Sequence, residues 1–170
     1  YAVGNSIISI STLDGLTDSI VVEVTHGLMY SLELITSDTS ISADDLLFIN
    51  ATRIDVNGNR LEIIIPLENW TQMADGIITL GNLTTGDITT WEPTFQGTKT
   101  LIATHEGFSE NISVFISRGL VSTLEILNND IASNDFLFNI TADQVITAEI
   151  KAFDSKGNLW YPSVDWAVSH

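Results

Sequence analysis

The sequence contains no cysteine, and it has only six lysine and arginine residues against 22 aspartate and glutamate residues. The absence of cysteine excludes disulfides, thiolate zinc sites and cysteine nucleophiles. The formal net charge of −16 over 170 residues argues against nucleic acid as a partner, because a phosphate-binding surface needs clustered cations. No apolar run approaches the roughly 18 residues of a membrane-spanning helix, so we expect no direct insertion into a membrane.

Helical periodicity is also missing, and a strand pattern takes its place. No segment carries an apolar stripe at helical spacing over three turns. Apolar residues at every second position, as at Ile20, Val22 and Val24, instead indicate a half-buried strand. Residues 61–65, 101–104 and 112–116 are similar short runs rich in β-branched residues, and turn-forming residues separate them. Together with a hydrophobic content of 44%, these runs predict an all-β sandwich.

The sequence repeats itself with a period of 92 residues. Residues 14–34 align without a gap on residues 106–126, and the glycines Gly27 and Gly119 are identical in this alignment. The match continues, with small changes of length, between Asn57-Gly58-Asn59 and Lys156-Gly157-Asn158, and between residues 66–70 and 162–166. A repeat of this length predicts a tandem array of similar domains.

The phase of the repeat predicts where each unit begins. Residues 28–119 form one complete unit, residues 1–27 are the final strands of a preceding unit, and residues 120–170 are the first strands of a following unit. Gly27 and Gly119 are the predicted joints. We expect the two partial units to be truncations of a longer array or to be completed by neighbouring chains, since exposed sheet edges pair readily.

Two sets of residues resemble a known family. The first passes from a tryptophan through a Gly-Thr corner into a strand ending in Ala-Thr and a final strand of alternating residues: Trp70…Ile77-Ile78-Thr79-Leu80…Pro93…Gly97-Thr98…Ile102-Ala103-Thr104…Ile112-Ser113-Val114. The second is an Asp-x-x-Gly-Asn hairpin, present as Asp55-Val56-Asn57-Gly58-Asn59 and Asp154-Ser155-Lys156-Gly157-Asn158. These features resemble the bacterial and archaeal immunoglobulin-like domains of the invasin, intimin and group 2 type. The resemblance implies immunoglobulin-like β-sandwiches in tandem on a cell surface, used as stalks, spacers or adhesive modules.

Residues suited to catalysis are few. His26 lies beside the Gly27 joint and His105 beside the Glu106-Gly107 turn, positions typical of exposed histidines. The adjacent carboxylates Asp44-Asp45 would point to opposite faces of a strand and so would not form an acid–base pair. We therefore expect no catalytic residues, and we expect that the protein is not an enzyme.

Calcium is the metal that the sequence suggests. Asp55, Asn57 and Asn59 place oxygen atoms at alternate positions around Gly58, as at the start of a calcium loop. No glutamate follows at the required distance, and Lys156 takes the central ligand position in the second copy. An ordinary Asn-Gly hairpin turn explains the same residues without metal, so both interpretations stay open.

Tryptophans and glycosylation sequons supply the remaining candidate sites. Trp70 and Trp166 are equivalent in the repeat and are predicted to pack in the core. Trp91 and Trp160 have no counterpart, so they either form an exposed platform for sugar rings or cover a sheet edge or a joint. Five Asn-x-Ser/Thr sequons mark possible N-glycosylation, at Asn50, Asn69, Asn82, Asn111 and Asn139.

The sequence as a whole favours a non-catalytic, extracellular, immunoglobulin-like repeat that acts as a spacer or adhesive module of a cell-surface or secreted protein. Its expected partners are neighbouring repeats or chains, and a surface glycan or a protein ligand. Two alternatives stay open: a glycan-binding accessory module of a secreted enzyme, and an adhesin made rigid by calcium.

Overall fold

The computed structural model describes residues 2–73, 82–128, 131–133, 143, 145 and 147–167. These residues form short strands and one turn of 3-10 helix, with bounds as follows: β1 (Gly4–Ser11), β2 (Thr17–Val24), β3 (Met29–Thr36), β4 (Ser40–Ser42), β5 (Leu47–Asp55), β6 (Arg60–Ile63), η1 (Leu67–Asn69), β7 (Trp70–Met73), β8 (Asn82–Thr84), β9 (Thr89–Glu92), β10 (Gly97–His105), β11 (Phe108–Ser117), β12 (Val121–Asn128), β13 (Ile131–Ser133), β14 (Ala148–Asp154) and β15 (Leu159–Trp160). Among them, no helix is long and apolar enough to cross a membrane.

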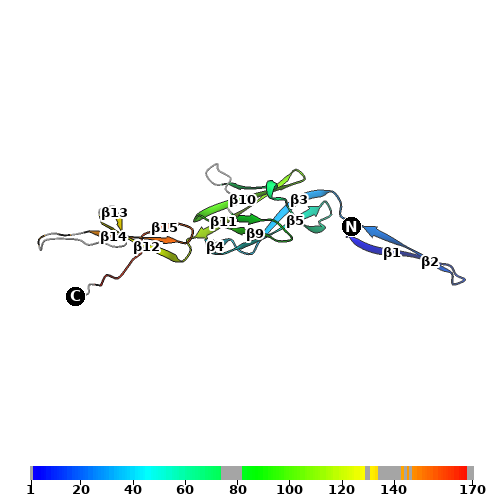
Figure 1. Cartoon of the computed structure of the whole chain (residues 1–170). Helices are drawn as coiled ribbons and strands as arrows, with labels where there is room; N and C mark the ends of the chain where they lie inside the picture. Colours follow the sequence, from blue (N-terminus) through cyan, green and yellow to red (C-terminus); the bar gives the residue numbers. More distant parts are fainter. Residues whose placement is uncertain are drawn as a thin grey trace.

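Two sheets form a sandwich in the middle of the molecule (Figure 1). One sheet has the strand order β4-β11-β10-β7, and the other has the order β3-β5-β9-β8 with β6 paired to β5. The hairpin β10–β11 is antiparallel from Gly97↔Ile116 to His105↔Phe108, whereas β4 runs parallel to the end of β11. The prediction of an all-β sandwich is confirmed.

The core of this sandwich lies between its two sheets. Alternating residues of β10 and β11 point inward, and Leu101 and Val114 have no exposed surface. Trp70 of β7 and Trp91 of β9 are each only 2% exposed, and the Trp70 indole N–H donates to the Ile65 carbonyl at 3.2 Å. The predicted core position of Trp70 is confirmed, because the apolar ring fills the space between the sheets and its polar atom finds a buried acceptor.

The N-terminal hairpin is separate from these two sheets. β1 and β2 pair only with each other, from Gly4↔Val24 to Ser11↔Thr17. Every residue of β1 is exposed, and so is every residue of β2 except Val24, which is half-buried. The hairpin extends from one end of the central sandwich (Figure 1).

The C-terminal strands form a fourth sheet with the order β13-β12-β14-β15. Its pairing repeats that of β3, β5 and β6. Met29 pairs with Asp55 and Val121 pairs with Asp154, and in both pairs of strands a β-bulge follows immediately. The central and C-terminal sheets therefore share one pairing pattern, displaced by 92 residues from Met29 to Val121 and by 99 residues from Asp55 to Asp154.

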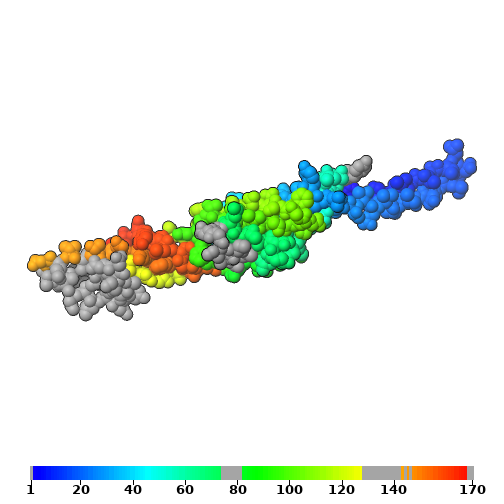
Figure 2. Space-filling model, turned by 90° about the horizontal axis from the view of Figure 1, so that it is seen from above, coloured from blue at the N-terminus to red at the C-terminus, as the bar shows by residue number. Residues whose placement is uncertain are grey.

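The C-terminal sheet lies at the end of the central sandwich opposite the hairpin, and the molecule is elongated (Figures 1 and 2). Trp166 is 60% exposed there, so its predicted position in a core is wrong. The physical reason is that Trp70 is covered by a facing sheet, whereas the described residues include no second sheet opposite β12 and β14.

Candidate functional site

The Asp-x-x-Gly-Asn hairpin of the central sandwich holds the first joint through one carboxylate. Oδ1 of Asp55 accepts the backbone N–H groups of Asn57 and Asn59, each at 2.9 Å. Oδ2 accepts the Asn59 side-chain amide at 2.9 Å and the backbone N–H of Gly27 at 3.0 Å. Gly58 closes the turn with a φ of 82°, a conformation that glycine adopts without strain. The side chain of Asp55 thus ties the chain leaving the hairpin β1–β2 to the end of β5.

The second copy of the hairpin makes the same four bonds at the second joint. Oδ1 of Asp154 accepts the N–H groups of Lys156 at 2.9 Å and Asn158 at 2.8 Å. Oδ2 accepts the Asn158 side-chain amide at 2.7 Å and the N–H of Gly119 at 2.8 Å. Gly157 has a φ of 85°, close to the value of Gly58. We call each arrangement a carboxylate clamp: an aspartate that joins its own turn to the glycine preceding its domain.

Hydrogen bonding keeps both clamp carboxylates ionised. Asn59 and then Gly27 lower the pKa of Asp55 far below its usual range, although partial desolvation opposes them. At Asp154, burial alone would raise the pKa, but the bonds from Gly119 and Asn158 outweigh it, so the pKa is lowered overall. A lowered folded-state pKa contributes stability that is fully present above the ordinary aspartate value of about 3.9 and is lost as pH falls through the folded-state pKa. Both clamps therefore hold at neutral pH and weaken only in strong acid.

The second joint has a further carboxylate, contributed by the central sandwich. Oδ2 of Asp44 accepts the backbone N–H of Leu120 at 2.7 Å, and its Oδ1 accepts the Ser155 hydroxyl at 3.0 Å. Asp44 lies between β4 and β5, while Ser155 belongs to the clamp turn of the C-terminal sheet. Asp44 thus bonds the joint from the central sandwich, whereas Asp154 bonds it from the C-terminal sheet.

Three more contacts fix the clamp turn of the C-terminal sheet against the central sandwich. The Asn158 amide donates to the Thr94 carbonyl at 2.9 Å, and its Oδ1 accepts the Gln96 N–H at 2.9 Å. Lys156 forms an ion pair with Glu92, and this lysine is the main cause of the lowered pKa of Glu92. The Lys156 side chain therefore forms a contact between the two units.

The first joint is held by fewer bonds from other residues. The guanidinium of Arg53 donates to the Gly27 carbonyl at 2.6 Å, and a ring nitrogen of His26 lies 3.1 Å from the Arg60 carbonyl oxygen. The first contact is to the backbone of the joint at Gly27, and the second is to the backbone of β6 at Arg60. His26 therefore has a structural position at the joint.

We expect Gly119→Ala to loosen the second joint. A Cβ at residue 119 would lie 2.3 Å from Oδ2 of Asp44, so this carboxylate would have to leave the Leu120 N–H and the Ser155 hydroxyl. The loss of one or two such bonds amounts to about 1–3 kcal/mol, which corresponds to roughly ten- to a hundredfold faster exchange of the Leu120 amide hydrogen. Hydrogen exchange followed by NMR measures this change.

Gly27→Ala is the matched control for this substitution. A Cβ at residue 27 would lie 3.4 Å from the nearest atom, Oδ2 of Asp55, so only a small adjustment is needed. We expect amide exchange at the first joint to change less than threefold. Equal effects of the two alanines would show that the position of Asp44 does not matter.

Of the predicted calcium ligands Asp55, Asn57 and Asn59, the Asp55 carboxylate already accepts N–H donors, and calcium binding at this turn stays a prediction. All four bonds to the Asp55 carboxylate come from N–H donors, and Asn57 and Asn59 present their backbone N–H groups to it. A cation bound by Asp55 would have to compete with these N–H groups for the lone pairs of the carboxylate. Within the described residues, no group of three or more histidine, aspartate or glutamate side chains is placed to hold a metal.

Trp91 and Trp160 do not form a common platform. Trp91 lies inside the central sandwich at 2% exposure, so its ring has no face open to a sugar, and it acts as a core residue. Trp160 is half-buried near the second joint, where the Arg118 guanidinium lies 4.5 Å from the ring centroid. A cation over an aromatic face is attracted by the ring quadrupole, so Trp160 covers the joint.

Three of the predicted glycosylation asparagines, Asn50, Asn82 and Asn111, lie on the exposed surface. Asn69 is half-buried beside Trp70, and Asn139 lies outside the described residues. Modification at these positions stays a prediction.

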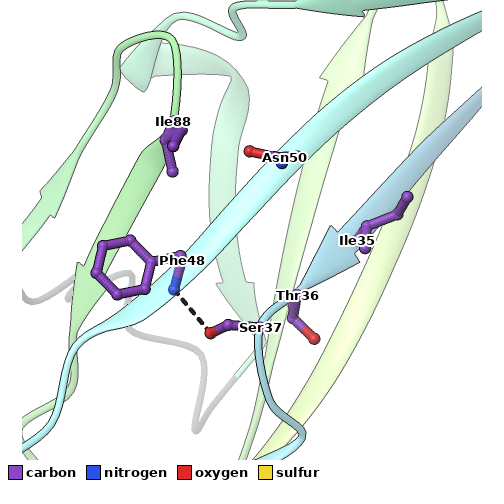
Figure 3. A pocket seen from close by; sticks show the side chains of 6 residues that line it. All are labelled: Ile35, Thr36, Ser37, Phe48, Asn50 and Ile88. Carbon is purple, nitrogen blue, oxygen red and sulfur yellow. Dashed lines mark hydrogen bonds between the residues drawn. The ribbon is translucent and has the colours of Figure 1, made fainter.

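Asn50 also lines a shallow pocket on the outer face of the sheet β3-β5-β9 (Figure 3). The other lining residues are Ile35, Thr36, Ser37, Phe48 and Ile88. The Phe48 N–H donates to the Ser37 hydroxyl at 3.3 Å across one side of it. None of the six residues carries a charge, so the pocket offers no carboxylate, imidazole or amine for acid–base chemistry.

Comparisons with known proteins give distant structural likenesses. No family model and no curated protein matches the chain. Among solved structures, the chain is similar to one described as surface layer protein SbsC, domains 4–9, with a TM-score of 0.35 and 15% sequence identity. The match covers 93% of this chain and 25% of the other, so the chain spans about a quarter of the length of that structure.

Proposed function

We propose that the chain is a non-catalytic spacer of tandem immunoglobulin-like units in a cell-surface or secreted protein. The carboxylate clamp is the observation that supports this proposal. It occurs twice, and each time the carboxylate accepts N–H groups from the same four positions. A spacer keeps its two ends at a fixed distance only if each unit holds its neighbour at a fixed angle. Repeat proteins achieve this through contacts between adjacent units.

Several features support a spacer over a catalyst. The contacts of the second joint join backbone groups and turns of the two units. The acidic side chains with lowered pKa values, Asp55, Glu92 and Asp154, all lie in clamps or in the ion pair at the joint. The carboxylates whose pKa values are lowered therefore form bonds that hold the units together.

The proposed location outside the cell rests on the family resemblance and on the exposed sequons at Asn50, Asn82 and Asn111. In this role, the elongated chain (Figure 2) holds another part of the same protein away from the surface. An adhesive contact would then be made by that distal part. The glycan-binding alternative needs an exposed Trp91 or Trp160; Trp91 is only 2% exposed, and Trp160 is half-buried.

A distance measurement across the second joint tests the spacer function. The chain has no cysteine, so spin labels attach only where Ser109→Cys and Ser122→Cys place them, on the exposed faces of β11 and β12. We expect a single narrow distribution of label-to-label distances by pulsed electron resonance. A broad distribution would overturn the spacer function, because the units would then move independently.

Calcium and chelator form the second arm of this experiment. The clamps use N–H donors, so we expect the same narrow distribution with millimolar calcium and with excess chelator. A distribution that is narrow only with calcium would favour the calcium-stiffened adhesin instead.

A further inference from the structure

The turn of the first clamp contains the one Asn-Gly pair of the sequence, Asn57-Gly58. This turn connects β5 to β6 and is bonded to the joint at Gly27 (Figure 1). Both residues of the pair are exposed to solvent. An asparagine loses its side-chain amide most readily when glycine follows it, because glycine has no Cβ to shield its own backbone nitrogen. The pair is therefore a candidate site of spontaneous chemical modification.

The reaction needs only these residues and water. The backbone nitrogen of Gly58 attacks Cγ of Asn57 and closes a succinimide ring, and the side-chain nitrogen of Asn57 leaves as ammonia with the proton of the Gly58 N–H. Water then opens the ring at either of its carbonyl carbons. Opening at Cγ leaves an ordinary aspartate. Opening at the backbone carbonyl leaves an isoaspartate, in which the chain runs through Cβ and Cγ and a carboxylate replaces the backbone carbonyl.

A hydrogen bond in the folded turn opposes this attack. The Gly58 N–H donates to the Asp55 carbonyl at 3.0 Å, so the Gly58 nitrogen reacts only when this bond opens. One backbone bond of this kind slows the reaction about two- to tenfold relative to the denatured chain. A delay of this size slows the reaction in the native protein without preventing it.

Other asparagines of the described chain are better protected. Asn50, Asn82 and Asn111 lie within strands and are followed by alanine, leucine and isoleucine, whose side chains shield the backbone nitrogen. Asn59 and Asn158 donate their side-chain amides to the clamp carboxylates at 2.9 and 2.7 Å. Asn57 should therefore react before any of these residues.

An isoaspartate at residue 57 would disturb the first clamp. Its extra backbone atom would separate the Asn57 N–H from the Asn59 N–H and side-chain amide, and all three of these groups now bond the Asp55 carboxylate. The new carboxylate would also carry a negative charge close to Asp55, which is ionised because the bonds from Asn59 and Gly27 lower its pKa. Both effects weaken the bond from the Gly27 N–H to Asp55.

The second clamp lacks this reactive amide. Lys156 occupies the position of Asn57 and makes the same backbone bond to its clamp aspartate, at 2.9 Å in both copies. A lysine side chain has no carbonyl carbon that the nitrogen of the following glycine could attack. The Lys156 side chain instead pairs with Glu92 of the central sandwich. Only the first of the two joints is therefore open to this modification.

We propose that Asn57 is a site of spontaneous deamidation, and that its conversion to isoaspartate releases the first joint with time while the second joint stays fixed. The inference rests on the hydrogen bonds of the clamps and not on the spacer function. Its failure would therefore leave the distance measurement across the second joint untouched.

The first test ages the full chain in warm, mildly alkaline buffer. Peptide mapping by mass spectrometry, with fragmentation that distinguishes isoaspartate from aspartate, follows each asparagine. We expect Asn57 to convert before Asn50, Asn82 and Asn111, and about two- to tenfold more slowly than in the same chain kept in denaturant. Conversion of these other asparagines while Asn57 stays intact would overturn the proposal.

The second test measures both joints in the converted protein, which ion exchange separates by its extra negative charge. Hydrogen exchange followed by NMR should show the Gly27 amide exchanging roughly ten- to a hundredfold faster, with the Gly119 amide unchanged. A Gly27 amide as protected as in fresh protein overturns the proposed release of the joint. An equal loss of protection at Gly119 overturns it as well, because the whole chain would then be opening.

Two substitutions of Asn57 identify the cause of the release. Asn57→Lys copies the second clamp, so after the same ageing it should keep the Gly27 amide protected; loss of protection in this variant would place the damage elsewhere and overturn the proposal. Fresh Asn57→Asp adds the charge without lengthening the backbone, and we expect it to speed Gly27 exchange less than about threefold. An effect as large as that of the isoaspartate would overturn the role given to the lengthened backbone.

Discussion

Trp70→Ala should lower the free energy of unfolding of the central sandwich by about 3–5 kcal/mol. The ring is 2% exposed between the two sheets, and its removal leaves a cavity that the neighbouring strands cannot close. The substitution also deprives the buried carbonyl of Ile65 of its indole donor. Chemical denaturation followed by circular dichroism gives the difference from the midpoint and slope of the transition.

Trp166→Ala is the control, because the repeat makes Trp166 the counterpart of Trp70. Its side chain is 60% exposed, so we expect a change within about 0.5 kcal/mol. A loss similar to that of Trp70→Ala would mean that Trp166 is already covered in solution.

The strands were predictable from sequence because their signal is local. A half-buried strand alternates apolar and polar residues, and residues 20–24 and 112–116 show this pattern and lie in β2 and β11. The same pattern fails to say whether an apolar face is covered. Val114 has no exposed surface, whereas its counterpart Val22 is 36% exposed, and only the presence of a facing sheet distinguishes them.

Trp91 shows a different limit of sequence reasoning. Its place in the core follows from alternation with Thr89, which is 4% exposed, along the four-residue strand β9. A strand this short gives a weak periodic signal. The repeat offers no help, because the position equivalent to Trp91 lies beyond residues 120–170.

Only the turn of each clamp is recognisable in the sequence. The Asp-x-x-Gly-Asn turn is recognisable, but its carboxylate suggests either a metal ligand or part of a turn, and nothing nearby in the sequence points to its third partner. That partner is the joint glycine, 28 residues before Asp55 and 35 residues before Asp154. The sequence does contain a signal for this partner, because an equivalent glycine precedes the turn in both copies. The two residues of such a long-range bond meet only in the folded chain, so the spacing in the sequence alone does not predict the bond.

Asp154→Asn should release the second joint. The amide keeps the size of the carboxylate but replaces one acceptor oxygen by an N–H donor. In the orientation that still serves Lys156 and Asn158 through Oδ1, this new donor faces the Gly119 N–H and the Asn158 amide, at positions now 2.8 and 2.7 Å from Oδ2. Leaving buried N–H groups without an acceptor costs about 1–3 kcal/mol. We expect the label-to-label distances between residues 109 and 122 to broaden and the Gly119 amide to exchange roughly ten- to a hundredfold faster.

Asp165→Asn supplies the matched control, since it removes the same charge from an exposed position near the end of the same unit. It should leave both the distances and the Gly119 exchange rate unchanged, which separates the loss of the clamp from the loss of one negative charge. Asp55→Asn should affect the Gly27 amide in the same way and spare Gly119, because each carboxylate bonds only the glycine of its own joint. If Asp154→Asn left the Gly119 amide as protected as before, the clamp would be a feature of the turn alone, and the angle between the units would have to be held by Asp44 and the Glu92–Lys156 ion pair.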